Sequence, residues 1–528
     1  MTRRGLPGGA GWTARVAVGV IGMVTVAILG CSTAAAKPRP NIILIQTDDQ
    51  DAATLTPDVM PRTVKLLRRH GTTFTDYVVS SPLCCPSRAE LLTGQYAHNS
   101  GVTWNRPDPY GDLREKANTL PVWLRRAGYR TAHVGKFLNF YERAVDDPDQ
   151  VAPGWDEWHT VLDPVDYYRY DLHENGRSVY HDSHARDYLT SVLNDKAARL
   201  IHRYVPRRRP LFLSVDQYAP HNSNLQYPDS KCGAGFPLPA PEDVDLFQHR
   251  GLPMAPSFNE PDVSDKPSFV RSEPHFRSDV RRHLTQQYRC RLASLREVDR
   301  GVAQIIGALR RGGELGNTAI VFTSDNGWFE GQHRIRGGKI DPYEEDLRVP
   351  FVVRLPRGLR PRHGFPRRLS STVANVDVAP TLLGLAGAKP CSRPGHCRTL
   401  DGRSMLRAIR SDGRHWPKHR GILVELQNPS PRARPFTPCD YEGIRTSHHV
   451  YIEYHSATVR SPDCVRREER EHYDLRADPF QLDNIFPAPP DTDEGRKESA
   501  LAARLADLRK CTGIRSRDPE PGSGNYCE

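Results

Sequence analysis

The stretch Asn41-Ile42-Ile43-Leu44-Ile45-Gln46 runs directly into Thr47-Asp48-Asp49. Its first part is a short, almost continuous apolar run, which is typical of a strand buried on both faces of a parallel sheet. Its second part places two carboxylates at the carboxyl end of that strand. Because ligands of open α/β sheets bind at the carboxyl ends of the strands, this stretch predicts a central strand with a site at its end.

Three further apolar runs have the same form and lead into polar residues: Arg130–Val134 into Gly135-Lys136, Leu211–Val215 toward Ala219-Pro220-His221, and Ala319–Thr323 into Ser324-Asp325-Asn326-Gly327. Helix-like segments lie between the runs, at Met60–His70, Thr119–Ala127 and Leu292–Leu309. This alternation predicts an α/β sandwich with a large, mostly parallel central sheet flanked by helices. The polar clusters would then converge at one edge of the sheet, although they are far apart in the sequence.

The chain has 528 residues, which favours a large catalytic domain with a smaller one. Strand-like pieces at Gly421–Leu426, Glu442–Thr446 and Val450–Tyr454 precede a helix-like segment at Ser499–Lys510. We therefore expect a catalytic domain over residues 37–404, a small C-terminal α+β subdomain over 405–510, and a tail over 511–528 tied down by its cysteines.

The N-terminus, residues 1–36, reads as a signal peptide. Three arginines precede an apolar stretch, Val16–Leu29, that is too short for a comfortable membrane span. Ile28-Leu29-Gly30-Cys31 resembles a bacterial lipobox, in which Cys31 would carry the lipid. Ordinary cleavage after Ala34–Ala36 and a true membrane anchor are the alternatives. All three predict an exported protein, a cell-envelope lipoprotein or a secreted one, that touches a membrane only through its N-terminus.

The formal net charge is +11, and it is +8 without the three arginines of residues 1–36. This excess suits an anionic substrate or surface, but a merely solvated basic surface would look the same. The sequence shows neither a zinc finger nor an aromatic RNA-binding motif, so no nucleic-acid partner is predicted.

The chain has 11 cysteines, which suits an oxidising compartment. If Cys31, Cys84 and Cys85 are set aside, an even number remains. Proximity in the sequence then suggests four disulfides: Cys391–Cys397, Cys439–Cys464, Cys511–Cys527 and Cys232–Cys290.

The densest chemical signal is Leu83-Cys84-Cys85-Pro86-Ser87-Arg88-Ala89-Glu90-Leu91-Leu92-Thr93-Gly94. Pro86 and Ser87 are typical of a helix start, and Gly94 of a helix end. Cys84 would then lie at the positive end of a short helix, where anions bind, and Arg88 would add donors one turn on. A disulfide or a structural thiol is the alternative.

The pattern Cys84-x-Pro86-Ser87-Arg88-x-x-x-Leu92-Thr93-Gly94 resembles the full signature of the type I sulfatase family. The resemblance implies an alkaline-phosphatase-like fold and hydrolysis of sulfate esters. It also implies that a formylglycine-generating enzyme converts Cys84 to Cα-formylglycine, whose hydrated aldehyde attacks sulfur. The matching metal set would hold one Ca²⁺ per chain: Asp48, Asp49, Asp325, Asn326 and residue 84. These oxygen ligands favour Ca²⁺ or Mg²⁺ over zinc.

The resemblance assigns the remaining roles. Lys136 and Lys339 would hold sulfate oxygens, Arg88 would steady the formylglycine, and His221 would protonate the leaving alcohol. Leu138 stands where many sulfatases carry a histidine that helps to release sulfate, so the base for that step is open. Asn139 or His333 could orient the hydrated aldehyde instead.

Two segments, Gly135-Lys136-Phe137-Leu138-Asn139 and Tyr96-Ala97-His98-Asn99, resemble the N-acetylglucosamine-6-sulfatase and heparan 6-O-endosulfatase branch. They imply a sulfated small molecule or glycan as substrate, with aryl sulfates as surrogates. The segment Cys232–Arg281 is rich in Pro, Phe and Asp, and we expect it to shape the substrate pocket. A formylglycine-dependent phosphonate or phosphate monoester hydrolase is an alternative. So is a silent lipoprotein that binds sulfated glycans, although the intact set of Cys84, metal ligands, Lys136, His221 and Lys339 argues against it.

Overall fold

The computed structural model describes residues 9–12, 39–145, 147, 150–206, 208–225, 227, 230–233, 235–361, 364, 368–427, 440–455 and 469–528. The lipobox around Cys31 and the predicted Cys439–Cys464 pair lie outside these residues. Residues Arg39–Glu528 form one compact unit. Within the described part of the chain, no helix has both the length and the apolar character needed to cross a membrane.

A ten-stranded sheet forms the centre of this unit. Its strand order is β11-β2-β10-β9-β1-β8-β4-β5-β6-β7. The five middle strands are parallel: β9 (Thr318–Ser324), β1 (Asn41–Thr47), β8 (Leu211–Asp216), β4 (Arg130–Lys136) and β5 (Glu157–Val161). Antiparallel pairs lie further out: β10 (Val352–Arg354) with β9 and β2 (Thr72–Phe74), and β6 (Tyr170–Glu174) with β5 and β7 (Ser178–His181). The outermost strand β11 (Arg368–Leu369) is parallel to β2. The predicted α/β fold with a mostly parallel sheet is confirmed.

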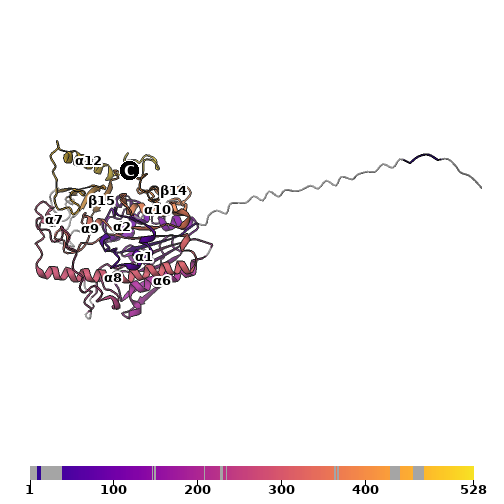
Figure 1. Cartoon of the computed structure of the whole chain (residues 1–528), viewed down its shortest axis with the longest axis horizontal. Helices are drawn as coiled ribbons and strands as arrows, with labels where there is room; N and C mark the ends of the chain where they lie inside the picture. The colour runs from indigo at the N-terminus through magenta and orange to yellow at the C-terminus, as the bar shows by residue number, and fades with distance from the viewer. Residues whose placement is uncertain are drawn as a thin grey trace, which may run out of the picture. The chain divides into compact units, whose positions relative to one another are not determined.

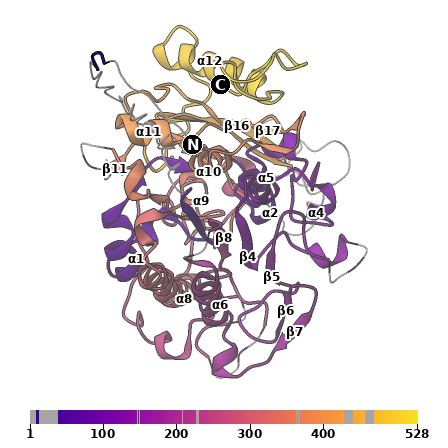
Figure 2. The same cartoon turned by 90° about the vertical axis from the view of Figure 1, so that its right-hand side faces the viewer.

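Helices cover both faces of the sheet, which explains the unbroken apolar run of β1. Ile42 and Leu44 pack into one hydrophobic core, and Ile43 and Ile45 pack into another. Figure 2 shows α2, α5 and α10 on one side of the central strands and α6 and α8 on the other. The bounds are α2 (Cys84–Thr93), α5 (Leu120–Arg126), α10 (Val378–Ala386), α1 (Pro61–Leu66), α6 (Leu189–Tyr204) and α8 (Ser278–Arg311).

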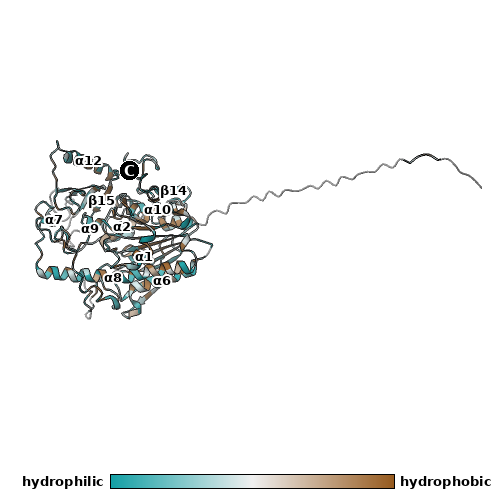
Figure 3. Ribbon diagram, in the orientation of Figure 1, coloured by the Kyte–Doolittle hydropathy of each residue, from teal (hydrophilic) through white to brown (hydrophobic). Residues whose placement is uncertain are grey.

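Two of the helices predicted between the strands of the central sheet have clearly different bounds in the structure. The helix expected at Leu292–Leu309 is α8, which begins at Ser278. Its first turns were not predicted because they are largely exposed and carry few apolar residues. Figure 3 shows hydrophilic and hydrophobic residues interleaved along it. The helix expected at Met60–His70 divides into α1 and the 3₁₀ helix η2 (Arg68–His70).

The C-terminal region holds a separate antiparallel sheet in the order β15 (Ile422–Gln427), β16 (Asp440–Arg445), β17 (His449–His455) and β18 (Arg470–Asp474). Helix α12 (Asp493–Leu508) contacts β16 and β17 (Figure 1). It begins before the predicted Ser499, where the Thr492 hydroxyl accepts a hydrogen bond of 3.1 Å from the backbone N–H of Gly495. The small C-terminal α+β region is therefore confirmed, whereas its boundary after residue 404 stays a prediction.

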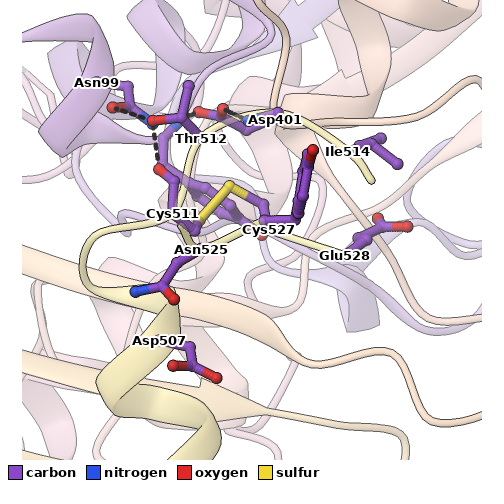
Figure 4. The surroundings of a disulfide bond; sticks show 12 residues. Asn99, Asp401, Asp507, Cys511, Thr512, Ile514, Asn525, Cys527 and Glu528 are labelled. Atoms are coloured by element: carbon purple, nitrogen blue, oxygen red, sulfur yellow. Dashed lines mark hydrogen bonds between the residues drawn. A yellow bond between two sulfur atoms is a disulfide. The ribbon is translucent and has the colours of Figure 1, made fainter. Parts of the chain in front are cut away.

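Three of the predicted disulfides are present: Cys232–Cys290, Cys391–Cys397 and Cys511–Cys527. The last one closes the C-terminal tail beside Asn99 and Asp401 (Figure 4). Asn99 Nδ2 donates to the Cys511 carbonyl at 2.8 Å and to Asp401 at 2.9 Å. Asp401 also accepts from the Gly513 N–H at 2.9 Å, so the tail is fixed to the segment around residue 99.

The remaining elements are short: η1 (Ala52–Thr54), β3 (Tyr77–Val78), α3 (Ala97–Ser100), α4 (Pro109–Asp112), η3 (Tyr141–Arg143), η4 (Ala185–Asp187), η5 (Pro241–Asp243), α7 (Ser268–Arg271), η6 (Leu315–Asn317), α9 (Glu344–Leu347), η7 (Arg357–Leu359), β12 (Val373–Ala374), η8 (Asn375–Asp377), β13 (Cys391–Arg393), β14 (His396–Cys397) and α11 (Leu406–Ser411).

Candidate active site

The acidic residues meet because β1 and β9 are parallel neighbours with Thr47 opposite Ser324. Both strands end there, and the next residues come together. The backbone N–H of Asp49 donates to Asp325 Oδ1 at 3.2 Å, and Asn326 Nδ2 donates to Asp49 Oδ1 at 2.7 Å. Asp49 has a positive φ of 69°, a costly conformation that the surrounding hydrogen bonds hold in place.

Cys84 is the first residue of α2, and its side chain faces this cluster. Its Sγ lies 3.4 Å from Asp48 Oδ1, 3.4 Å from Lys136 Nζ and 2.7 Å from Lys339 Nζ. The positive end of the helix adds to the attraction for an anion at this point. The predicted nucleophile, metal ligands and lysines are thus in one place.

Gly135 allows β4 to bring Lys136 to the site. Its φ is 117°, and a Cβ atom at this position would lie 1.9 Å from the carbonyl oxygen of Asp216 on the neighbouring strand β8. Only glycine fits both the conformation and the space. The next residue, Lys136, pairs through its ammonium group with Asp48, as Lys339 pairs with Asp49.

Arg88 lies one turn into α2 and bridges the two acidic strand ends. Its Nε donates to Asp325 Oδ2 at 2.8 Å, its Nη2 lies 3.3 Å from Asp48 Oδ2, and its Nη1 donates to the Lys136 carbonyl at 2.9 Å. The side chain is only 4% exposed, so its guanidinium group contacts protein groups rather than solvent. Three buried carboxylates therefore face the buried Arg88 and Lys136 and the partly buried Lys339, which makes their burial tolerable.

These charges move the pKa values in different directions. Burial alone would raise the pKa of Asp48, but Lys136, His221, Lys339 and Arg88 hold it well below its ordinary value. Burial and the neighbouring Asp48 charge raise the pKa of Asp325 to about 6. Burial, followed by the Asp48 charge, raises the pKa of the Cys84 thiol far above its ordinary value.

His221 follows β8 and reaches the cluster from another side. Its Nδ1 lies 2.8 Å from the Asn222 carbonyl and 2.9 Å from the Tyr218 hydroxyl. Because a carbonyl oxygen only accepts, Nδ1 carries the proton in the neutral ring, and Nε2 is the nitrogen 3.8 Å from Asp49 Oδ2. Burial lowers the pKa of His221, although Asp49 and Asp48 oppose this.

The acidic cluster fits a hard divalent cation. Carboxylate oxygens of Asp48, Asp49 and Asp325 lie within 4.8 Å of one another. Asp49 Oδ2 is buried and has no hydrogen-bond partner in the described part of the chain. A buried, unpaired carboxylate oxygen is costly, and a cation bound by oxygen ligands would satisfy it.

The two residues suggested for orienting the hydrated aldehyde have other contacts. His333 Nδ1 lies 2.7 Å from Glu260 Oε2, and its ring stacks on Tyr343. Burial would lower the pKa of His333, but Glu260 and Glu345 raise it to about 9. The backbone N–H of Asn139 donates to Cys85 Sγ at 3.3 Å. A role for either residue at position 84 stays a prediction.

Sequence reasoning missed two residues that support the site. Asp216 ends β8, 3.8 Å from Arg88 Nη1 and 3.2 Å from His133 Nδ1. As an acidic residue directly after an apolar run, it repeats the pattern of Asp48 and could have been found. Arg291 on α8 is 1% exposed and donates to the carbonyls of Asp49 and Pro220. A single arginine in an amphipathic helix gives no such signal.

The fold and the site together are typical of a metal-dependent hydrolase for an anionic ester. Residues 40–388 match the family model described as Sulfatase, and residues 331–510 match that of N-sulphoglucosamine sulphohydrolase, C-terminal. The chain therefore belongs to the sulfatase family and is a sulfuric ester hydrolase with an alkaline-phosphatase-like fold.

Relatives agree with this family. The chain is 32% identical over 532 residues to an arylsulfatase of Volvox carteri, covering 95% of this chain and 79% of the relative. It is 30% identical over 519 residues to an N-acetylglucosamine-6-sulfatase of Homo sapiens, covering 93% and 88%. Its fold is similar to that of BT4656 in complex with its substrate D-glucosamine-2-N,6-O-disulfate, with a TM-score of 0.70 at 23% identity, covering 89% of this chain and 98% of that one.

Proposed function

We propose that this sulfatase removes sulfate from sulfated sugars, with 6-O-sulfated glucosamines as the substrate class, by means of a formylglycine at position 84 and one Ca²⁺. The observation that carries the proposal is the convergence of Lys136, Lys339 and the acidic cluster on the side chain of residue 84. The relatives named for N-acetylglucosamine 6-sulfate support the substrate class.

Asp48, Asp49, Asp325 and Asn326, with residue 84, would hold the cation. The formylglycine would supply an oxygen nucleophile at position 84, and the bound Ca²⁺ would supply a Lewis acid for a sulfate oxygen. The unpaired Asp49 Oδ2 and the three clustered carboxylates support this ligand set. Arg88, almost fully buried, holds Asp48 and Asp325 in position.

The two lysines would bind the sulfate group itself. Their ammonium groups flank the side chain of residue 84, so an anion next to that side chain lies between two fixed positive charges. Such preorganised charges stabilise negative charge that develops on the sulfate oxygens. Both lysines stay protonated, because the neighbouring carboxylates more than offset the effect of burial and raise their pKa values above the ordinary value.

His221 would protonate the leaving alcohol. Its side chain is 24% exposed, unlike the fully buried Asp49 beside it, so it borders both the cluster and the space from which a substrate enters. Because Nδ1–H is held by the Asn222 carbonyl, the ring must first take up a second proton on Nε2. A histidine in hydrogen-bond reach of the ester oxygen can then deliver that proton as the bond to sulfur breaks.

The test is sulfate release from N-acetylglucosamine 6-sulfate, from its 3-sulfated isomer and from an aryl sulfate, each with wild type and Cys84→Ala. We expect the 6-sulfate and the aryl sulfate to be hydrolysed by wild type only. We also expect a chelator to abolish turnover and Ca²⁺ to restore it. Faster turnover of phosphonate monoesters than of any sulfate ester would instead support the phosphonate hydrolase.

We also propose that the protein is exported and matured by a formylglycine-generating enzyme. The basic and apolar N-terminal segment and three disulfides support export. Mass analysis of the mature N-terminus from the native host distinguishes a lipidated Cys31 from cleavage after Ala34–Ala36, and an intact N-terminus would contradict both.

A further inference from the structure

A second cluster of metal-ligating side chains lies in the C-terminal region, apart from the residues of the candidate active site. It comprises His449 on β17, His472 on β18 and Glu494 in the first turn of α12, and we call it the C-terminal histidine cluster. In the antiparallel register, His449 is opposite Asp474 and Tyr451 is opposite His472. The two histidines are therefore diagonal neighbours on one face of the sheet.

The spacing of the two imidazoles fits a shared ion. His472 Nε2 lies 3.4 Å from His449 Nδ1. Two nitrogen ligands of one tetrahedral zinc, at bonds of about 2.0 to 2.1 Å, are about 3.3 to 3.4 Å apart. Ligand atoms of both histidines and of Glu494 lie within 4.8 Å of one another, so small rotations would bring the carboxylate into the same shell.

The glutamates around the cluster supply a second, independent observation. Glu494 Oε1 accepts from Lys497 at 2.6 Å, but Oε2 is buried and has no hydrogen-bond partner among the described residues. Glu498 Oε2 lies 3.3 Å from His472 Nδ1 and accepts from the Ala488 N–H at 3.2 Å. A carboxylate on the far nitrogen of a histidine is the usual support of a metal ligand, and here it directs Nε2 into the cluster.

We propose that His449, His472 and Glu494 form a second metal site, for a transition metal of which Zn²⁺ fits best, separate from the catalytic cation. Imidazole and carboxylate ligands suit zinc, whereas the oxygen ligands of the active site suit Ca²⁺. A bound ion would fasten α12 to the β17–β18 edge.

The test measures zinc in the full-length protein after dialysis against a chelator and reloading with Zn²⁺ in excess Ca²⁺. Wild type is compared with His472→Gln, with Glu494→Gln and with the control His448→Gln, which replaces an exposed histidine on the same hairpin. We expect wild type and control to bind one zinc equivalent at the cluster. We expect none in His472→Gln, and affinity at least about tenfold weaker in Glu494→Gln.

Turnover of an aryl sulfate and Ca²⁺ content should not change in these variants, which separates this proposal from the proposed function. Cobalt in place of zinc should give the intense visible absorption of a tetrahedral site in wild type and His448→Gln, but not in His472→Gln. His472 is fully buried, so His472→Gln could fail to fold. The Glu494 side chain is 37% exposed, and Glu494→Gln therefore keeps the test valid in that case. Equal zinc content in wild type, His472→Gln and Glu494→Gln would overturn the proposal in favour of a plain histidine–histidine hydrogen bond.

Discussion

The candidate active site and the C-terminal histidine cluster both gather ionisable side chains where secondary structures meet, but they balance charge differently. In the active site, three buried carboxylates face three cations, of which Lys339 is only partly buried: Asp48, Asp49 and Asp325 against Arg88, Lys136 and Lys339. In the cluster, two imidazoles lie among glutamates: Glu494 is near both rings, and Glu498 Oε2 lies 3.3 Å from His472 Nδ1. The active site should therefore be sensitive to the loss of any charge, whereas the partly exposed Glu494 of the cluster should tolerate substitution at little cost to folding.

The largest effect is expected at residue 84. Cys84→Ala removes the group that becomes the nucleophile, and turnover of an aryl sulfate should fall by about 10⁴-fold or more. The matched control is Cys85→Ser, since Cys85 is the neighbouring buried thiol and carries no proposed chemistry. Steady-state kinetics on both variants checks this. Retention of a tenth of the activity by Cys84→Ala would break the assignment.

The next effect concerns proton delivery. His221→Gln should lower turnover of a sugar sulfate by about 10²- to 10⁴-fold, because its leaving alcohol needs a proton. A nitrophenyl sulfate, with a leaving group that departs without protonation, should lose much less. The ratio of turnover of the sugar sulfate to that of the nitrophenyl sulfate serves as an internal control. An equal loss of turnover on both substrates would contradict the role of His221 as the acid.

The third prediction contrasts the charges of the two regions directly. Arg88→Met leaves Asp48 and Asp325 buried without their shared partner and should lower the free energy of unfolding by about 3 to 5 kcal/mol in the cation-free protein. Glu494→Gln, in the cluster, should change it by less than about 1 kcal/mol. Urea unfolding of both variants in chelator measures the difference. Equal losses would contradict the proposed contrast.

The smallest expected effect is on the pH dependence of folding stability, through the contact of His98 with the C-terminal region. Burial alone would lower the pKa of His98, but Glu425 on β15 and the Cys511 carbonyl raise it to about 9. A pKa raised from 6.5 in the unfolded chain stabilises the folded state below pH 6.5, by on the order of 3 kcal/mol, and this contribution disappears as pH rises through 9.

His98→Gln should therefore destabilise the protein at pH 6 and have little effect at pH 10. Thermal unfolding of both proteins across this range checks it. If the loss of stability in His98→Gln relative to wild type grew as pH rises, it would contradict the stabilising role of the His98–Glu425 pair.

How much could be predicted from sequence differs between the two regions for a physical reason. Parallel strands all end at one edge, so Asp48, Lys136 and Asp325 could be placed together from the apolar runs before them. The histidine cluster depends on the register of an antiparallel sheet and on where α12 begins. That register places His449 and His472 as diagonal neighbours, which their separation in sequence does not reveal. Asp216 was predictable in principle, whereas Arg291 depends on how α8 packs.

The most direct test of the central claim is mass spectrometry of the tryptic peptide that contains residue 84, from protein made in its native host. Conversion of the thiol to formylglycine predicts a loss of about 18 Da relative to the cysteine form. That loss, found together with sulfate ester turnover, is the result that we expect. An unmodified Cys84 that reacts with an alkylating agent, in a preparation that hydrolyses the ester at full rate, would contradict the account.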